Sequence, residues 1–386
     1  MKNKNQNIYI KGTSLNTFLS GVGYFTKELT QSLVAQDKKN NYFLFSFLFR
    51  TKKLPKEPIN NNPNLSYVYV RNVPIKLYNG LFKLGIAPKI DSFFSTKPNL
   101  IIYPDFVRLP SSKNIKTMVV VHDLSFIHVP EFSQDKNRRF LNKYVKKSVI
   151  DADKVIAVSK NTKKEIIKEY SIPSSKISTI NSSIDHHRFN IRPEMEIKNV
   201  IEKYNINNKY ILFTGTIEPR KNIVGIIEGY ARLRKYTQDE YALVLAGGKG
   251  WKDEEIEESL NRYSNLNIIR TGYIADEDLP ALYSGASLFV FPSHYEGWGI
   301  PILEAMACGV PVITANNTSL PEVAGDAAIM IDSKDTHALT SNIEKVLKNH
   351  ILRRDMIKKG LKQSKKFSWQ KSGRELKELI NRELNG

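Results

Sequence analysis

The chain has 386 residues, which is more than one hydrophobic core usually serves, so two domains are expected. An apolar fraction of 41% and a charged fraction of 25% are ordinary for a globular protein and exclude a largely disordered chain. The net charge of +19 is concentrated in residues 1–185, where 30 Lys and Arg face 13 Asp and Glu, and this asymmetry indicates an acidic partner for one domain.

The expected location is the cytoplasm, with peripheral contact to the inner face of the cytoplasmic membrane as an option. Cys308 is the only cysteine, which excludes an intramolecular disulfide and is typical of a reducing compartment. The N-terminal residues lack the apolar segment of a secretory signal. The longest apolar run, residues 42–49, is too short to cross a bilayer.

Short apolar runs separated by helical lengths of mixed sequence predict parallel strands that are covered on both faces. In the first half these runs are residues 8–10, 42–49, 66–70, 99–104, 117–123, 154–159 and 177–180. In the second half they are residues 210–215, 241–247, 267–274, 287–293, 310–315 and 327–331. The pattern predicts an α/β protein of two doubly wound domains, with the boundary inside the polar stretch 182–209.

Two N-terminal stretches, 74–94 and 136–147, interleave cations with aromatic and aliphatic residues. Such stretches suit the surface of an anionic membrane, where cations meet the head groups and rings lie at the boundary. The alternative is that both are ordinary amphipathic helices with their apolar faces in the core. Nucleic acid is not expected as a partner, because no DNA- or RNA-binding motif accompanies the charge.

Two loops that follow predicted strands carry cations. Arg220 and Lys221 follow the run 210–215, and Lys249 follows the run 241–247. Cations placed where a strand leads into a helix suit a diphosphate ligand. The alternative for the first loop is an exposed turn in which Asn222 caps a helix.

The segment 294–313 places Glu296 in a glycine-containing loop and Glu304 inside the helix that follows. Pro301 suits the first helical position, and Gly309 is the expected helix stop. Glycines before the helix leave backbone N–H groups open near the positive end of the helix dipole. We expect a sugar or phosphate ligand there, with each carboxylate receiving hydrogen bonds from a different part of it; a helix cap with two incidental glutamates is the alternative.

The ordered set of motifs resembles the retaining glycosyltransferases of family 4. Residues 296–313 are similar to the family's signature of two glutamates, residues 20–29 to its glycine loop, and residues 121–132 to its histidine segment. Further similar segments lie at 215–223, 245–251, 272–293 and 319–328, so the resemblance covers nearly the whole chain.

The resemblance implies the GT-B fold, in which two Rossmann-like domains face each other across a cleft. It implies an acceptor-binding domain over 1–185, a nucleotide-sugar-binding domain over 186–366, and a C-terminal helix over 367–386 that returns to the first domain.

Carried over residue by residue, the resemblance implies catalytic roles for His122, Arg220, Lys221 and Glu296. The two cations neutralise the diphosphate, Glu296 faces the donor sugar, and Glu304 binds the ribose hydroxyls. His122 lies beside the reacting sugar, with Asp123 as a candidate to orient its ring. The other implied binding residues are Gly21, Gly23, Gly215, Thr216, Gly248, Lys249, Tyr273, Ile274, Gly297, Trp298, Gly299 and Ile300. One departure is Tyr24, where the family frequently has Arg.

The reaction that this resemblance implies is cleavage of an anomeric bond, which builds negative charge on the departing diphosphate. We expect a front-face displacement, in which the leaving phosphate accepts the proton of the acceptor. No metal and no cofactor are expected. The two Asp-x-Asp pairs that could hold a metal are Asp151 with Asp153, predicted to lie in a turn, and Asp276 with Asp278, predicted to lie at a helix start.

The expected reaction moves mannose from GDP-mannose to a lipid-linked or oligosaccharide acceptor in the synthesis of a surface polysaccharide such as lipopolysaccharide. The alternative donors are UDP- or dTDP-linked glucose or rhamnose. A nicotinamide dehydrogenase is disfavoured, because residues 21–26 lack the third glycine of that fingerprint. The remaining alternative is a non-catalytic membrane- or nucleic-acid-binding module on the same fold.

Overall fold

The computed structural model describes residues 5–15, 20–49, 59, 62–71 and 73–385. The chain forms two compact units: unit 1 contains Met1–Leu124, Lys136–Ser182 and Trp369–Gly386, and unit 2 contains Ser125–Asp135 and Ser183–Ser368. The sequence analysis assigned residues 125–135 to the N-terminal domain, whereas their contacts in the structure group them with unit 2.

Unit 1 is built on a parallel seven-stranded sheet with the order β3-β2-β1-β4-β5-β6-β7. Its strands are β1 (Asn7–Lys11), β2 (Asn41–Phe47), β3 (Leu65–Val70), β4 (Leu100–Tyr103), β5 (Lys116–Val121), β6 (Lys154–Ala157) and β7 (Ile177–Thr179). The central strands β4 and β5 are buried almost throughout, which explains why their sequences read as continuous apolar runs.

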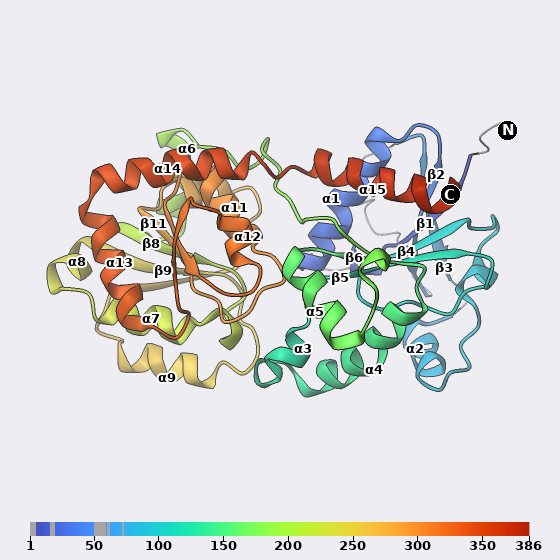
Figure 1. The fold of residues 1–386 in the computed structure, drawn as a ribbon. Helices are drawn as coiled ribbons and strands as arrows, with labels where there is room; N and C mark the ends of the chain where they lie inside the picture. Colours follow the sequence, from blue (N-terminus) through green and yellow to red (C-terminus); the bar gives the residue numbers. More distant parts are fainter. Residues whose placement is uncertain (1–4, 16–19, 50–58, 60–61, 72, 386) are drawn as a thin grey trace. The chain divides into compact units, whose positions relative to one another are not determined.

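The helices of unit 1 flank this sheet (Figure 1). They are α1 (Gly21–Gln36), α2 (Ile75–Lys83), α4 (Asp135–Asp151), α5 (Lys160–Tyr170) and α15 (Trp369–Asn385), with short 3-10 turns at Thr13–Leu15, Ile90–Phe93 and Ser174–Lys176. The C-terminal helix α15 packs on α1, where Ser32 Oγ donates to the carbonyl of Trp369 at 2.7 Å and Lys377 Nζ donates to the carbonyl of Gln36 at 2.7 Å. Gly373 allows this close approach, because a Cβ there would lie 2.5 Å from Ser32 Oγ.

Unit 2 is built on a parallel six-stranded sheet with the order β10-β9-β8-β11-β12-β13. Its strands are β8 (Lys209–Thr214), β9 (Tyr241–Ala246), β10 (Ile268–Gly272), β11 (Leu288–Phe291), β12 (Val312–Ala315) and β13 (Ala328–Ile331).

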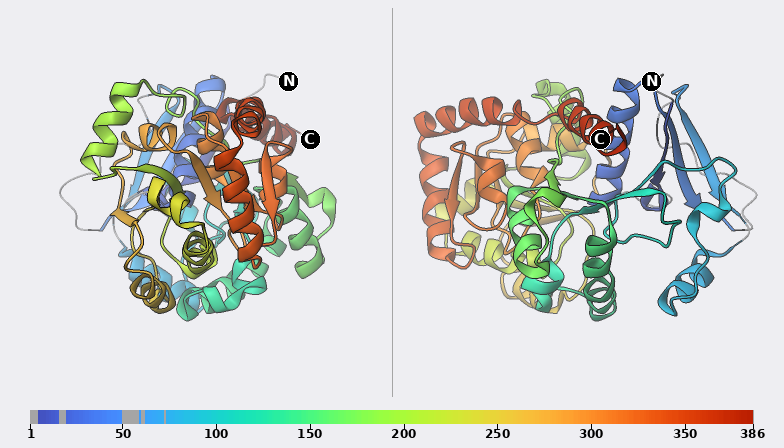
Figure 2. Two further views of the ribbon diagram at one scale, coloured as in Figure 1. Left: turned by 90° about the vertical axis from the view of Figure 1, so that its left-hand side faces the viewer. Right: turned by 45° about the vertical axis from the view of Figure 1, so that its right-hand side comes forward.

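The helices of unit 2 are α3 (Ser125–His128), α6 (Glu194–Lys203), α7 (Ile223–Ala231), α8 (Lys235–Glu240), α9 (Glu254–Arg262), α10 (Leu279–Ser284), α11 (Ile300–Ala307), α12 (Leu320–Ala324), α13 (Thr336–Lys348) and α14 (His350–Ser364). Short 3-10 turns lie at Pro130–Phe132 and Pro219–Lys221. Further views of these helices and their sheet are given in Figure 2.

The prediction of two doubly wound α/β domains is confirmed, and each apolar run named above overlaps one of the strands. Taken in chain order, the strands of each unit follow the arrangement 3-2-1-4-5-6, with one further strand at the end of unit 1. In this arrangement the strand order reverses between the first and fourth strands, and ligands bind outside the carboxyl ends of the strands at that point. In unit 2 the reversal lies between β8 and β11.

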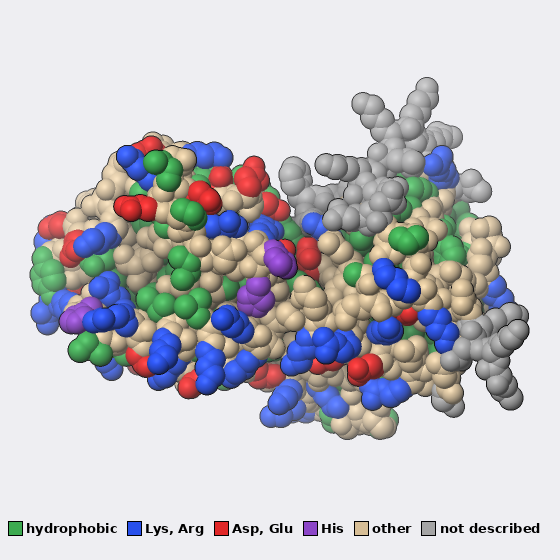
Figure 3. Space-filling model, turned by 90° about the horizontal axis from the view of Figure 1, so that it is seen from above, with side chains coloured by type: hydrophobic (Ala, Val, Ile, Leu, Met, Phe, Trp, Pro, Cys, Tyr) green, Lys and Arg blue, Asp and Glu red, His purple; other side chains and the backbone are tan. Residues whose placement is uncertain are grey.

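The surface carries a mixture of charges. The face in Figure 3 shows many Lys and Arg side chains with Asp and Glu among them. Within the part of the chain that the structure describes, no helix is long and apolar enough to cross a membrane.

Candidate functional site

The loops that follow β8 and β11 meet at the reversal point of unit 2. The backbone N–H of His294 donates to the carbonyl of Arg220 at 2.9 Å, which ties the two loops together. Asn222 adopts a left-handed conformation with φ +60°, and its side-chain amide donates to the carbonyls of Pro292 and Ser333 at 3.1 and 2.6 Å. The turn Pro219–Lys221 is therefore anchored and partly buried, and Asn222 stands at the N-cap position of α7 without a side-chain cap hydrogen bond.

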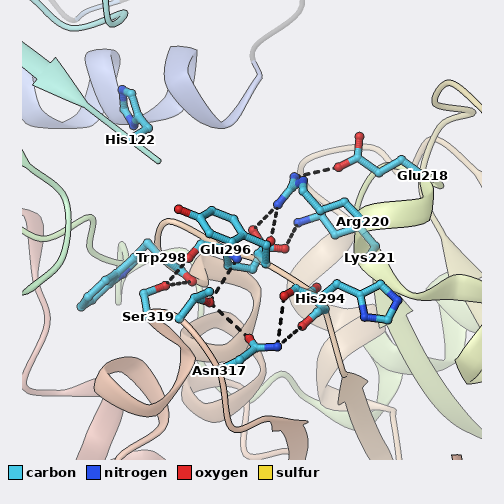
Figure 4. A network of polar contacts seen from close by, with 12 residues as sticks. His122, Glu218, Arg220, Lys221, His294, Glu296, Trp298, Asn317 and Ser319 are labelled. Carbon is cyan, nitrogen blue, oxygen red and sulfur yellow. Dashed lines mark hydrogen bonds and ion pairs between the residues drawn. The ribbon is translucent and has the colours of Figure 1, made fainter. Parts of the chain in front are cut away.

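Arg220, Lys221 and Glu296 form one ion-pair cluster (Figure 4). Arg220 Nη1 donates to Glu296 Oε2 at 2.9 Å and to the carbonyl of Tyr295 at 2.7 Å. Lys221 Nζ donates to Glu296 Oε1 at 2.5 Å and lies 4.8 Å from the centre of the Phe291 ring. Both oxygens of the Glu296 carboxylate are thus occupied by cations of the neighbouring loop.

Electrostatics fix the charge states of this cluster. Burial works to raise the pKa of Glu296, but the charges of Arg220 and Lys221 outweigh burial and hold the pKa below its ordinary value. Burial lowers the pKa of Lys221, against the opposite effect of Glu296. The cluster therefore contains an ionised carboxylate between two cations.

Glu218 is a fourth member of the cluster, and the sequence analysis did not identify it. Its Oε1 accepts a hydrogen bond from Arg220 Nη2 at 2.7 Å, and only 1% of the residue is exposed. Its Oε2 is buried and has no hydrogen-bond partner among the described residues. Burial raises the pKa of Glu218, although Arg220 and Lys221 act against it. The signal was present in the sequence, because Glu218 stands two residues before Arg220.

The loop that contains Glu296 is held in place by three consecutive residues after β12, which the sequence analysis also did not assign to the site. Asn317 donates to the carbonyls of Ser293 and His294 at 3.2 and 3.1 Å, and Thr318 Oγ1 accepts from the Glu296 backbone N–H at 3.2 Å. Ser319 Oγ lies 2.8 Å from the carbonyls of Glu296 and Trp298 (Figure 4). These contacts fix the backbone on both sides of Glu296.

The glycine loop itself is enclosed. Gly297, Trp298 and Gly299 are buried, and Ile300 begins α11. Pro301 lies in the first turn, one residue later than predicted, and Gly309 follows the helix with φ +76°, as expected of a helix stop. The expectation that backbone amides of this loop bind sugar hydroxyls stays a prediction.

Glu304 has a separate hydrogen-bond chain. The hydroxyl of Tyr283 donates to Glu304 Oε2 at 2.8 Å, and Tyr283 is in turn 2.6 Å from Thr214 Oγ1 at the end of β8. Burial raises the pKa of Glu304 to about 7, and Arg188 acts in the opposite direction. Glu304 lies on α11 beside the end of β8, which is compatible with a ligand that spans the loops after β8 and β11.

The loops after β8 and β9 run side by side. The Ile217 N–H donates to the carbonyl of Gly248 at 2.9 Å, and Gly215 lies against Lys221, since a Cβ at Gly215 would be 3.9 Å from Lys221 Cε. Gly247 is required for this approach, because a Cβ there would lie 1.8 Å from the carbonyl oxygen of Gly215. The backbone of Gly248 therefore borders the cation loop.

Thr216 and Lys249 belong to the same pair of loops, but Lys249 does not join the ion-pair cluster. Thr216 packs against Gly250, where a Cβ would lie 3.0 Å from Thr216 Cγ2. The Lys249 side chain is 65% exposed and pairs with Asp253 at 2.8 Å.

Tyr273 and Ile274 follow β10, and their environments differ. Tyr273 is 66% exposed, and its hydroxyl donates to Asp276 Oδ1 at 3.3 Å, whereas Ile274 is buried. Arg188 Nη2 donates to the carbonyl of Asp276 at 2.8 Å. Since Arg188 and Asp276 also act on the pKa of Glu304, these residues share its surroundings.

The segment Ser125–Asp135 packs on the same loops of unit 2. Trp251 Nε1 donates to the carbonyl of Phe132 at 2.8 Å, and Lys252 Nζ donates to the carbonyl of Glu131 at 2.6 Å. The ring of Phe132 stacks on His294 with centroids 5.3 Å apart, and His294 Nδ1 lies 3.1 Å from Ser333 Oγ, so the ring makes both a packing contact and a polar contact.

In unit 1, His122 follows β5 and is held by the backbone. Its Nε2 lies 2.7 Å from the carbonyl of Pro104, so Nε2 carries the proton and Nδ1 is the acceptor. Phe25 and Phe106 pack on the ring at 4.9 and 5.2 Å. Burial lowers the pKa of His122, so the ring is neutral at pH 7. The sequence analysis named Asp123 as a candidate to orient this ring; the hydrogen bond found is to Pro104, the charge of Asp123 acts to raise the pKa of His122, and an orienting role of Asp123 stays a prediction.

The predicted glycine loop of unit 1 forms the first turn of α1. Ser20 caps this helix by accepting from the N–H of Gly23 at 3.4 Å, and Gly21 is exposed, with open space where a Cβ would project. Contact of Gly21 and Gly23 with phosphates stays a prediction.

The acidic pairs that were considered as metal ligands have structural partners. Asp153 accepts from the backbone N–H of Thr117 at 2.8 Å, and Asp278 accepts from Lys203 and Tyr204 at 2.6 and 2.8 Å. Among the described residues, no group of three or more His, Cys, Asp or Glu side chains is arranged to hold a metal ion.

Two family models match the chain. Residues 19–188 match "Glycosyltransferase Family 4", and residues 196–363 match "Glycosyl transferases group 1". The two matches fall on either side of the predicted domain boundary.

The chain is also similar to individual glycosyltransferases. The chain is 38% identical to O-antigen chain mannosyltransferase B of Escherichia coli over 361 residues, which are 91% of this chain and 93% of that protein. It is 35% identical to the serotype-specific mannosyltransferase WbdA of Escherichia coli over 263 residues, 66% of this chain and 32% of that longer protein. Among solved structures, sucrose-phosphate synthase from Thermosynechococcus elongatus has a TM-score of 0.74 at 19% identity, covering 98% of this chain and 99% of that one.

Proposed function

Because the chain belongs to glycosyltransferase family 4, with the GT-B fold, and is a glycosyltransferase, we propose that it transfers mannose from GDP-mannose to a glycan or lipid-linked acceptor during surface polysaccharide synthesis. The similarity to O-antigen chain mannosyltransferase B supports the sugar and the pathway class. The observation that carries the proposal is the cation pair Arg220 and Lys221, held by Glu296 at the reversal point of the unit 2 sheet.

We assign the donor diphosphate to this cation pair. Two cations fixed by Glu296 and by the carbonyl of Tyr295 need little reorganisation to receive a diphosphate. Charge that develops on a leaving group is stabilised most by groups that are already oriented. The glutamate on α11, Glu304, is then the acceptor for ribose hydroxyls, and the surroundings of Tyr273 and Ile274 are assigned to the base.

The proposed chemistry is a front-face displacement with retention of configuration. The bond from the anomeric carbon to the phosphate oxygen breaks with its electron pair going to the diphosphate, and the acceptor oxygen forms the new bond on the same face. The acceptor proton passes to the departing phosphate oxygen. We assign Glu296 to cation positioning and sugar binding, and the acceptor nitrogen Nδ1 of His122 to a sugar hydroxyl. Trapping of a glycosyl adduct on Glu296 would contradict this scheme.

The experiment starts from a thermal-shift panel of GDP-mannose, UDP-glucose and dTDP-rhamnose, because a ligand that binds the native state raises the melting temperature. The preferred nucleotide sugar is then incubated with the protein and a membrane extract as the source of acceptors.

Lys221→Met is expected to lower transfer by about 10²–10³-fold. Lys249→Met is the matched control and should leave transfer near the wild-type rate, because the Lys249 side chain is 65% exposed and pairs with Asp253 rather than with Glu296. Retention of transfer within about tenfold by Lys221→Met would refute the assignment.

We propose that no metal takes part, because the two cations Arg220 and Lys221 are assigned to the charge of the diphosphate. Transfer should therefore continue in the presence of EDTA. A loss of transfer that added Mg²⁺ restores would contradict this.

We further propose that unit 1 contacts an anionic membrane surface, which suits a lipid-linked acceptor. The support is a basic apolar surface on α2, the loop after it and α4, made of Lys76, Leu77, Lys83, Leu84, Ile86 and Lys143. Leu77, Leu84 and Ile86 are 54%, 73% and 67% exposed. The two stretches singled out in the sequence come together here, since Phe82 and Tyr144 pack with ring centres 4.8 Å apart.

Sedimentation with vesicles tests this surface. Binding to vesicles that contain phosphatidylglycerol is expected, with little binding to pure phosphatidylcholine. The double variant Leu84→Ser with Ile86→Ser should lose most of the binding, whereas Ile351→Ser on α14, also 67% exposed, should retain it. Equal binding by both variants would refute the assignment of this surface.

A further inference from the structure

The ion-pair cluster of unit 2 contains more negative charge than a diphosphate site needs. Two carboxylates, Glu218 and Glu296, face two cations, Arg220 and Lys221, so the four side chains are neutral when all are ionised. A nucleotide sugar adds two ionised phosphates. Four negative charges would then share two cations in a buried environment, where like charges close together cannot all remain ionised.

The two carboxylates differ in how well they hold their charge. Glu296 receives hydrogen bonds from both cations, at 2.9 and 2.5 Å. Glu218 receives one hydrogen bond, from Arg220 at 2.7 Å, and its other oxygen is buried with no hydrogen-bond partner among the described residues. An ionised carboxylate with one unsatisfied buried oxygen is the costlier of the two.

Other titratable groups near Glu218 do not relieve this imbalance. The adjacent loop carries Lys249, Lys252 and Asp253, but Lys249 pairs with Asp253 and Lys252 donates to the carbonyl of Glu131. The groups that act electrostatically on Glu218 are Arg220, Lys221 and Glu296. When negative charge is added at the cation pair, Glu218 is therefore the first carboxylate expected to become protonated.

We infer that Glu218 takes up a proton from solvent when the diphosphate of the donor binds to Arg220 and Lys221, so that donor binding is coupled to protonation of this carboxyl group. This inference rests on the proposed assignment of the diphosphate to the cation pair. It makes Glu218 a charge-compensating residue, which does not have to touch the reacting atoms. Donor affinity should consequently increase as the pH falls, by up to about tenfold per pH unit for one proton.

Isothermal titration calorimetry measures this proton directly. GDP-mannose is a suitable probe, because its diphosphate is esterified at both ends, and the single ionisable group on each phosphate stays ionised near neutral pH. The binding enthalpy is measured in several buffers of different ionisation enthalpy at one pH, and the slope gives the number of protons taken up. Glu218→Gln, which keeps the shape of the side chain, is expected to lower this slope relative to the wild type.

Two control variants isolate the contribution of Glu218. Glu228→Gln, on the partly exposed surface of α7, should leave the slope unchanged. Glu304→Gln should raise the slope, because ribose hydroxyls that bind the ionised Glu304 release its proton. The difference between the slopes of the wild type and Glu218→Gln is free of the proton released by Glu304, because both proteins contain Glu304.

The outcomes separate the inference from the function on which it rests. An equal slope in wild type and in Glu218→Gln, with binding intact, overturns the inference and leaves the diphosphate assignment standing. Wild-type binding that Lys221→Met does not weaken overturns the diphosphate assignment itself. If Glu218→Gln does not fold, the pH dependence of the GDP-mannose dissociation constant of Glu304→Gln decides. This variant lacks the titration of Glu304, and an affinity that does not increase as the pH falls below 7 contradicts proton uptake by Glu218.

Discussion

Replacing Glu296 with Gln tests whether this carboxylate holds the two cations in place. Glu296 is 8% exposed, and both of its oxygens accept hydrogen bonds from cations. Removal of one partner of a buried ion pair costs about 3–5 kcal/mol, because the remaining charge is left uncompensated. Gln retains the volume and one acceptor oxygen, so we expect the lower end, about 3 kcal/mol.

The assay is thermal unfolding followed by circular dichroism, with and without GDP. For a unit of this size, about 3 kcal/mol corresponds to a melting temperature lower by roughly 6–12 °C. GDP at about 100 times its dissociation constant should stabilise the wild type by about 2.7 kcal/mol. It should stabilise Glu296→Gln by more at the same concentration, because the diphosphate supplies the negative charge that the variant lacks.

The control is Glu254→Gln, an exposed residue of α9, which should unfold as the wild type does. If the carboxylate served only the donor sugar, GDP, which lacks that sugar, would stabilise Glu296→Gln and the wild type equally. A loss of less than about 1 kcal/mol, or a GDP effect no larger than in the wild type, would refute the reasoning.

Two further predictions concern Glu304 and the glycines after β9. The folded-state pKa of Glu304, about 7, lies above its ordinary value of 4.5, so the folded state keeps a proton that the unfolded state has lost between these values. Stability contributed by this group is therefore full below about pH 4.5 and falls by about 3 kcal/mol as the pH rises to about 7. Chemical denaturation should show Glu304→Gln to be more stable than the wild type at pH 8 and equal to it near pH 4.5; a pH-independent difference would contradict the shift. Gly247→Ala should lower stability by more than about 3 kcal/mol, because its Cβ would meet the carbonyl oxygen of Gly215 and its φ is +154°. Gly248→Ala has open space and should change stability by less than about 1 kcal/mol, so equal effects in the same denaturation assay would show that the loop relaxes.

The sheet topology was accessible from the sequence because buried parallel strands read as continuous apolar runs. Each run, from 8–10 to 327–331, overlaps a strand, and the alternation of these runs with helices predicted the doubly wound architecture. The helix from Ile300 and its stop at Gly309 were accessible for a similar reason, since Pro and Gly mark helix ends.

Side-chain pairing was not accessible, because it depends on which loops the topology brings together. Arg220 and Glu296 are 76 positions apart, and no spacing rule places a cation on a carboxylate over that distance. The sequence identified the cations and both glutamates but neither the role of Glu218 nor the loop contacts of Thr318 and Ser319. Lys249 follows a strand, but its side chain is exposed and paired with Asp253, and the predicted ligand contact stays a prediction.

The return of α15 to unit 1 has a consequence for engineering this enzyme by recombination. A chimera with a single crossover near residue 183 would join the first half of one parent to the second half of another, and it would inherit α15 from the wrong parent. The contacts of Ser32 and Gln36 with this helix would then join mismatched surfaces. Exchange of the main segment of unit 2, Ser183–Ser368, therefore requires two junctions, one near residue 183 and one near residue 368, and exchange of the whole unit requires two more, on either side of Ser125–Asp135.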